Sequence, residues 1–151
     1  MIYLWLEWFQ ENVLDYTSTF EELNPNSKYL KNKSSILGVS PDAIVKDKYI
    51  VSTTTLAAFI NEHVNETIDV LKIDIEGHEF AALKGLFAEP TKHAIKYIQI
   101  EDHTDDMYLN KTPFNAIKAL LSENGFEIKY IIKHGFGNIN EVIFYNTTIN
   151  H

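Results

Sequence analysis

The sequence contains no cysteine and no arginine. Without cysteine the chain has no disulfide, no thiolate zinc or iron–sulfur site and no cysteine nucleophile. All 13 basic residues are lysine, and 21 acidic residues bring the formal net charge to −8. Proteins that bind nucleic acid usually present a basic face and use arginine for bidentate contacts to guanine or phosphate. The composition therefore predicts that nucleic acid is not a partner.

Long apolar runs are also missing. No stretch approaches the roughly 20 apolar residues that a membrane-spanning helix needs. The apolar start of the chain has neither a basic flank nor a small-residue cleavage site. We therefore expect a cytoplasmic protein without a membrane span. A length of 151 residues with 45% hydrophobic residues is typical of one folded domain.

The order of strand and helix patterns predicts an α/β fold, a sheet with helices on its faces and an antiparallel hairpin at the carboxyl end. The expected strands are 49–51, 68–75, 95–100 and the hairpin strands 126–133 and 141–145. The expected helices are one capped at 53–55 and ending near 64, one at 78–87, and one ending near 124. The last begins at Thr112-Pro113, with the threonine hydroxyl as the cap and the proline as the first helical residue. Residues 2–13 fit either a helix or a strand. Residues 24–41 have the composition of a loop.

Acidic side chains end two of these strands. Asp74 and Glu76 close the first, and Glu101 closes the second; His78 and His103 follow them as candidate general bases or metal ligands. Ligands of open α/β sheets bind beyond the carboxyl ends of the strands, so neighbouring strands would bring these groups around one crevice. Close carboxylates raise each other's pKa or hold a cation such as Mg²⁺, Ca²⁺ or Mn²⁺. The same residues also suit helix capping, and the spacing alone assigns no metal ligand.

The segment Ile68–Gly85 resembles the hallmark segment of FkbM-type methyltransferases in residue type, order and spacing. Other stretches resemble further parts of that family: Ser34–Leu37, Thr53–Ile60, Tyr97–Glu101 and Leu121–Phe126. The resemblance covers about Ser34 to Tyr145, so we expect an FkbM-like region at 34–151 behind an unmatched segment at 1–33. It implies a class I, Rossmann-like methyltransferase that uses S-adenosylmethionine (SAM) and methylates a hydroxyl group of a sugar or other small molecule.

The resemblance also implies residue roles. Asp74 and Glu76 would end the fourth strand of the family's sheet, near the methyl donor and acceptor, and Glu101 would end the fifth. The implied catalytic residues are Asp74, Glu76, His78 and Glu101, and the implied cofactor contacts are Asp74 and Ser35. The implied mechanism is in-line methyl transfer to an oxygen that a carboxylate or histidine positions and deprotonates.

One part of the family pattern is missing. The family's SAM site begins with a strand and a Gly-rich turn, whereas here no Gly-x-Gly precedes Asp74. We therefore expect the carboxyl-terminal part of such an enzyme, either truncated or completed by another chain. The alternatives are a non-catalytic half-Rossmann remnant that serves as a binding or assembly module and, from the acidic strand ends alone, a metal-dependent hydrolase.

The missing first strand has a consequence for the sheet edge. In the family's sheet the fourth strand lies beside the first, so residues 68–75 would present an unpaired apolar edge, which promotes aggregation or strand addition. We expect residues 2–9, a second copy of the chain or another protein to cover it.

Overall fold

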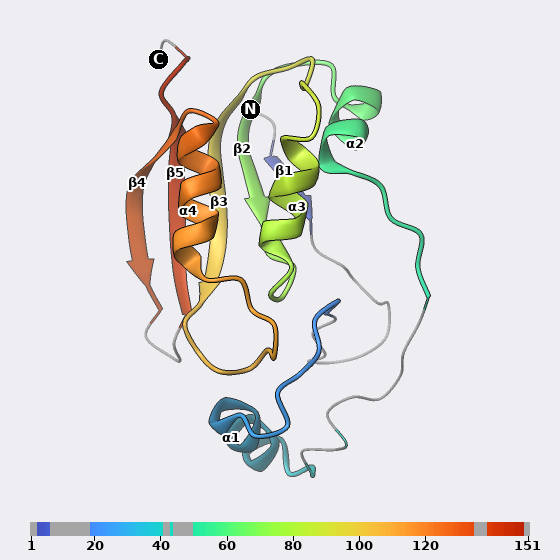
Figure 1. Ribbon diagram of the computed structural model, residues 1–151, viewed down its shortest axis with the longest axis vertical. Coiled ribbons are helices and arrows are strands. Elements are labelled where there is room, and N and C mark those ends of the chain that lie inside the picture. Colours follow the sequence, from blue (N-terminus) through green and yellow to red (C-terminus); the bar gives the residue numbers. More distant parts are fainter. Residues whose placement is uncertain (1–2, 7–18, 41–42, 44–49, 135–138, 150–151) are drawn as a thin grey trace.

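The computed structural model describes residues 3–6, 19–40, 43, 50–134 and 139–149, and its centre is a five-stranded sheet (Figure 1). The strand order is β1-β2-β3-β5-β4, with bounds Tyr3–Leu6 for β1, Ile68–Ile73 for β2, Ile95–His103 for β3, Phe126–Lys133 for β4 and Ile139–Asn146 for β5. Strands β1, β2 and β3 are parallel, whereas β5 is antiparallel to β3 and β4. The α/β fold and the carboxyl-terminal hairpin are thus confirmed.

The described helices do not cover the sheet evenly. Helices α3 (Glu79–Leu86) and α4 (Phe114–Glu123) lie on one face, α2 (Leu56–His63) contacts α3, and α1 (Lys28–Leu37) lies beyond the carboxyl ends of β2 and β3 (Figure 1). Side chains that point to the opposite face, such as Val70, Tyr97 and Ile143, are only partly buried. The sequence predicted helices on the faces of the sheet without showing this uneven cover.

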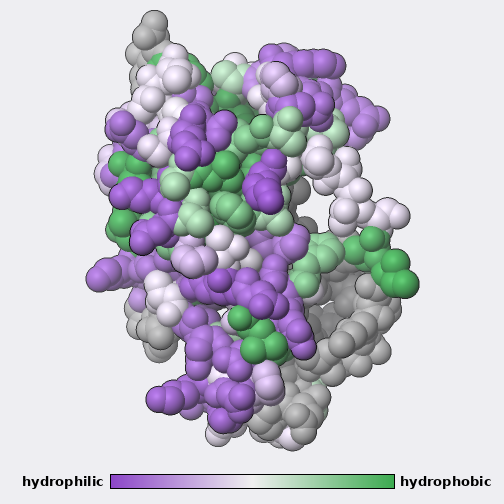
Figure 2. Space-filling view, viewed as in Figure 1, coloured by the Kyte–Doolittle hydropathy of each residue, from purple (hydrophilic) through white to green (hydrophobic). Residues whose placement is uncertain are grey.

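The main core lies between the sheet and helices α2, α3 and α4. Alternate residues of the central strands, Leu71, Ile73, Ile98 and Ile100, are fully buried. Each such side chain contributes roughly 1.5–3 kcal/mol by leaving water. Hydrophilic residues form a band across the middle of the face in Figure 2, at the level where β2 and β3 end. The central strands therefore place polar residues at the end of a dry core.

The sequence predicted hydroxyl caps at the amino-terminal ends of α2 and α4, and the structure has only the first. The Thr55 hydroxyl accepts the Ala58 N–H at 3.1 Å and caps α2, as predicted. The expected cap of α4 was wrong, because Pro113 itself occupies the cap position and no side chain there accepts a hydrogen bond. The hydroxyl of Thr112 comes one residue too early for that role.

The loop expected at 24–41 is also corrected, because it contains the ten-residue helix α1. Ser27 caps the helix by accepting the Leu30 N–H, and the Asp106 carboxylate accepts the N–H groups of Lys28 and Tyr29. Gly38, with φ of 67°, ends it. Asp106 lies far along the chain, so local composition could not reveal this support for the helix.

The amino-terminal segment forms a strand where it is described. Tyr3–Leu6 pairs in parallel with β2, from Tyr3 opposite Val70 to Leu6 opposite Ile73. This pairing confirms that the start of the chain covers the β2 edge, and it decides the helix-or-strand question for those four residues. The strand expected at 49–51 is not confirmed: Ile50 and Val51 lie outside any strand, and residue 49 lies outside the described residues.

Candidate acidic site at the ends of two parallel strands

A tight turn after β2 presents the first acidic groups. Glu76 has φ of 53° and Gly77 has φ of 99°. The Thr19 hydroxyl donates to the Glu76 carbonyl, and the Tyr108 hydroxyl donates to Glu76 Oε2, both at 2.6 Å. Beneath the turn, the buried Glu79 carboxylate accepts the Gly77 N–H at 3.0 Å. Contacts on both sides therefore hold Glu76 in an uncommon backbone conformation.

The end of β3 supplies the second group. His103 is 5% exposed, and its Nδ1 lies 3.3 Å from Asp105 Oδ2. Its Nε2 lies 3.1 Å from Glu101 Oε2 and 3.7 Å from Glu76 Oε2. Nevertheless, Nε2 makes no aligned hydrogen bond with any described residue. The imidazole is therefore buried, and its Nε2 faces Glu101 and Glu76.

The structure brings the three predicted carboxylates together. Asp74, Glu76 and Glu101 each place an oxygen within 4.8 Å of the others, as the parallel pairing of β2 and β3 requires. Lys72 Nζ lies 2.9 Å from Asp74 Oδ2 and 3.8 Å from Glu141 Oε1. The crevice thus contains more acidic than basic side chains.

Burial and charge shift the acidities in opposite directions. Burial raises the pKa of Asp74 even though Lys72 opposes the shift. The neighbouring His103 lowers the pKa of Glu101. Burial alone would lower the pKa of His103, but Asp105 and Glu101 together raise it to about 10. At neutral pH the imidazolium is therefore a counter-charge of the acids, and burial makes Asp74 a better proton acceptor than it would be in water.

Two other predicted site residues lie outside this group. His78 Nδ1 lies 2.7 Å from Glu21 Oε1, and the ring lies beside Phe20. Ser35 is exposed on α1, where its carbonyl accepts the Gly38 N–H. The structure therefore does not bring His78 or Ser35 into the cluster of three carboxylates, and their catalytic and cofactor-binding roles stay predictions.

Sequence reasoning passed over two residues of the crevice. Lys72 is the only basic residue in the stretch 68–77 and comes two residues before Asp74, which was a usable signal. Tyr108 gave no such signal, because a tyrosine in a loop is unremarkable until the fold places it over Gly77. Burial and the Glu76 carboxylate raise the pKa of Tyr108, so it remains a hydrogen-bond donor to Glu76.

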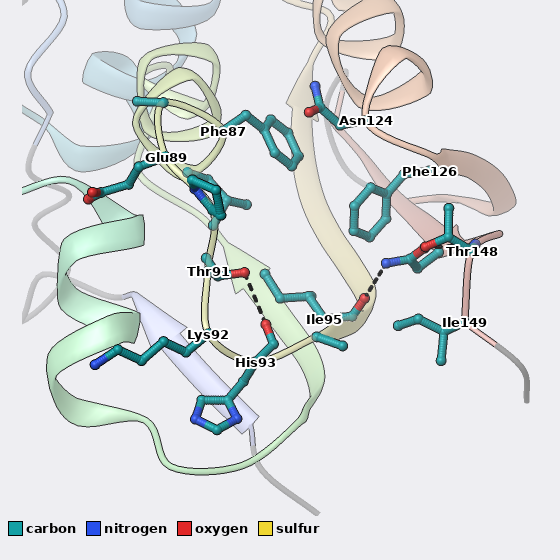
Figure 3. Close-up of a pocket in the computed structure, with 15 residues that line it drawn as sticks. Phe87, Glu89, Thr91, Lys92, His93, Ile95, Asn124, Phe126, Thr148 and Ile149 are labelled. Atoms are coloured by element: carbon teal, nitrogen blue, oxygen red, sulfur yellow. Dashed lines mark hydrogen bonds between the residues drawn. The ribbon is translucent and has the colours of Figure 1, made fainter.

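A hollow of about 540 Å³ lies at the other end of the sheet (Figure 3). Its lining includes Phe87, Pro90, His93 and Phe126. Two of its polar side chains bond the backbone: Thr91 Oγ1 donates to the His93 carbonyl, and Asn146 Nδ2 donates to the Ile95 carbonyl. The hollow lies at the start of β3, whereas the acidic cluster lies at its end.

The profile of the methyltransferase FkbM domain matches residues 10–128, more than three quarters of the chain. This chain belongs to the FkbM methyltransferase family. The matched range contains all three carboxylates and begins inside the segment at 1–33, while the division at residue 34 stays a prediction. Neither a curated protein nor a solved structure shows significant similarity to this FkbM chain. None of the described helices has the length and apolarity to cross a membrane.

Proposed function

We propose that this FkbM-family chain takes part in SAM-dependent methylation of a hydroxyl group on a sugar or other small molecule. The observation that carries the proposal is the position of the acidic cluster. It lies beyond the carboxyl ends of two parallel strands, where α/β sheets bind ligands, and inside the range matched by the methyltransferase profile.

The cluster supplies what an acceptor hydroxyl needs. A hydroxyl group is a poor nucleophile until a base takes its proton, and a positioned carboxylate typically speeds such a step by about 10²–10⁴-fold. Asp74 suits this role because burial raises its pKa. Glu101, paired with His103, stays ionised and is suited to hold the acceptor by hydrogen bonds.

The described residues fit the acceptor better than the cofactor. When bound, SAM supplies the methyl group, and its nucleoside requires a close backbone approach and a hydrogen bond to the ribose. The chain has no Gly-x-Gly before the acidic cluster and no arginine to pair with the methionine carboxylate. The described residues therefore do not form a complete SAM site, and the carboxylates' part in the reaction is limited to the acceptor side.

This incomplete site predicts weak binding of SAM. A hydrogen bond to a charged group is worth about 1.5–3 kcal/mol, and every 1.4 kcal/mol changes affinity about tenfold. Loss of the ribose contact and of the Gly-rich turn should weaken binding about a thousandfold or more. Calorimetry of the purified chain should therefore show no binding below about millimolar SAM. Micromolar binding would show that other residues of this chain rebuild the site.

A methyl-transfer assay tests the function itself. The full chain is incubated with labelled SAM and a panel of sugar and small-molecule hydroxyl acceptors. The SAM concentration is set several times above the expected dissociation constant, because binding is expected to be weak. We expect ether-linked label that is lost in Glu101→Gln and kept in Glu123→Gln, an exposed carboxylate on α4. No label with any acceptor would overturn the proposal and favour the non-catalytic binding module.

A further inference from the structure

The spacing of the three carboxylates suits a bound ion. Two ligands on opposite sides of a small divalent ion lie about 4.2 Å apart, because each bond is about 2.1 Å long. The oxygens of Asp74, Glu76 and Glu101 all lie within 4.8 Å of one another. Such carboxylates repel one another unless a proton, an imidazolium or a cation lies among them.

His103 provides an independent sign of a ligand. Its side chain is 95% buried, and Nε2 lies 3.1 Å from Glu101 Oε2 and 3.7 Å from Glu76 Oε2 without an aligned hydrogen bond to a described residue. On the other side of the ring, Nδ1 lies against Asp105, whose second oxygen accepts the Met107 N–H at 3.0 Å. A carboxylate that holds one ring nitrogen of a histidine while the other meets a metal is the usual support of metal-binding histidines.

The surrounding contacts orient the carboxylates and leave oxygen lone pairs for an ion. Lys72 donates to Asp74 Oδ2, and Tyr108 donates to Glu76 Oε2. A carboxylate has about four acceptor positions, so neither contact prevents coordination. Because a histidine ligand must be neutral, an ion displaces the Nε2 proton and itself becomes the positive charge that balances the acids.

A second group of possible ligands, Glu101 with His134 and Glu141, lies nearby but is less suited. Gln99 donates to Glu141 Oε2 at 2.9 Å, and Lys72 lies 3.8 Å from its other oxygen. The His134 side chain is 45% exposed. Glu141 therefore already has partners, and His134 lacks the buried, oriented ring of His103.

We propose that Asp74, Glu76, Glu101 and His103 bind one divalent transition-metal ion of the Mn²⁺ class. Carboxylate oxygens suit Mg²⁺, Ca²⁺ and Mn²⁺, whereas an imidazole ligand favours first-row transition metals. Three oxygens and one nitrogen therefore favour Mn²⁺ over Ca²⁺, which prefers an all-oxygen site. The site does not depend on methyl transfer, although an ion there would lie where the acceptor hydroxyl is expected.

Titration with MnCl₂ tests this site without any measurement of activity. The full chain is freed of metal with a chelating resin, and free Mn²⁺ is followed by electron paramagnetic resonance. We expect one saturable site that Ca²⁺ displaces poorly, at least tenfold weaker in Glu76→Gln, and about 10–100-fold weaker in Asp105→Asn, which removes the support of His103. Glu123→Gln and Glu141→Gln should bind as the unmodified chain does.

Other results would overturn the proposal. The first is the absence of saturable binding up to millimolar Mn²⁺. The second is unchanged Mn²⁺ affinity in Glu76→Gln. The third is loss of binding in Glu141→Gln alone, which would assign the ion to the neighbouring group of Glu101, His134 and Glu141. Circular dichroism of each variant confirms that it is folded. Because the readout is free Mn²⁺, a negative methyl-transfer assay leaves this result unaffected, and the reverse also holds.

Discussion

The two ends of β3 carry polar groups of different kinds. At its start, around the hollow of Figure 3, the neutral side chains of Thr91 and Asn146 donate to backbone carbonyls, and the Lys92 ammonium donates to the Asn61 carbonyl. At its end, Glu101 and His103 are ionisable and face other ionisable groups across a crevice. The first arrangement satisfies the backbone and stabilises the fold. The second gathers charge that folding does not need.

This difference distinguishes polar groups that stabilise the fold from polar groups that are available for chemistry. A buried hydrogen bond from a neutral amide to a carbonyl contributes about 1 kcal/mol and leaves no group unsatisfied. Three carboxylates within 4.8 Å of one another cost free energy unless a proton, an imidazolium or a cation lies among them. Perturbed acidities of this sort are enriched at functional sites. The acidic end is therefore the better candidate for chemistry, although the hollow lies at the other end.

The largest effect on stability is expected at the turn that presents Glu76. A Cβ on Gly77, whose φ is +99°, would lie 2.9 Å from the Tyr108 ring, so Gly77→Ala should destabilise the fold by about 2–4 kcal/mol. Gly85→Ala is the matched control. Gly85 lies inside α3, and a Cβ there would lie 3.5 Å from Thr55, an ordinary van der Waals distance. That change should stabilise by about 0.5–1 kcal/mol. Urea denaturation measures both, and equal effects would contradict this account of the turn.

The next effect belongs to the start of β3. Asn146→Ala removes the donor to the Ile95 carbonyl and should cost about 1–3 kcal/mol, while Mn²⁺ binding stays unchanged. The control is Asn124→Ala, whose exposed amide donates to the Leu120 carbonyl and should cost under about 0.5 kcal/mol. Urea midpoints give the stabilities. A change in Mn²⁺ affinity in Asn146→Ala would show that the two ends are coupled.

The acidic end should behave in the opposite way. Glu76→Gln should abolish methyl transfer but change stability by under about 1 kcal/mol, because the amide oxygen still accepts the Tyr108 hydroxyl. Methyl-transfer rates and urea midpoints, measured on the same preparation, separate the two effects. If Glu76→Gln lost several kcal/mol and activity together, the carboxylate would be a structural residue.

The smallest effect concerns Asp106 at the start of α1. The Lys28 N–H and the Ser27 hydroxyl lower the pKa of Asp106 to about 2, from 3.8 for an unpaired aspartate. A lowered pKa means that the stabilisation is present above about pH 4 and is lost as the pH falls toward 2. Amide hydrogen exchange at Leu30 should therefore speed up in that window beyond its intrinsic pH dependence. Asp106→Asn should show faster exchange at pH 5 and little further change.

Much of the central architecture could be predicted because its signals are local. The apolar run of β2, the Thr55 cap and the hairpin were recognisable from neighbouring residues alone. Helix α1 was missed because Asp106, which lies 78 residues beyond Lys28, accepts its first N–H groups. The shift in register between Ile128 and Tyr130 in β4 likewise depends on pairing with β5 and leaves no mark in the sequence.

The sequence by itself determined which residues end the two parallel strands, and therefore that Asp74, Glu76 and Glu101 are candidates for one site. The tertiary structure decided everything that depends on distance. It paired β2 with β3 in register, covered the free edge with β1, and buried His103 between Asp105 and the acids. It also turned His78 toward Glu21. The reason is that residue order fixes side-chain type and local backbone preference, whereas charge–charge interactions depend on separation and burial, which exist only after the chain has folded.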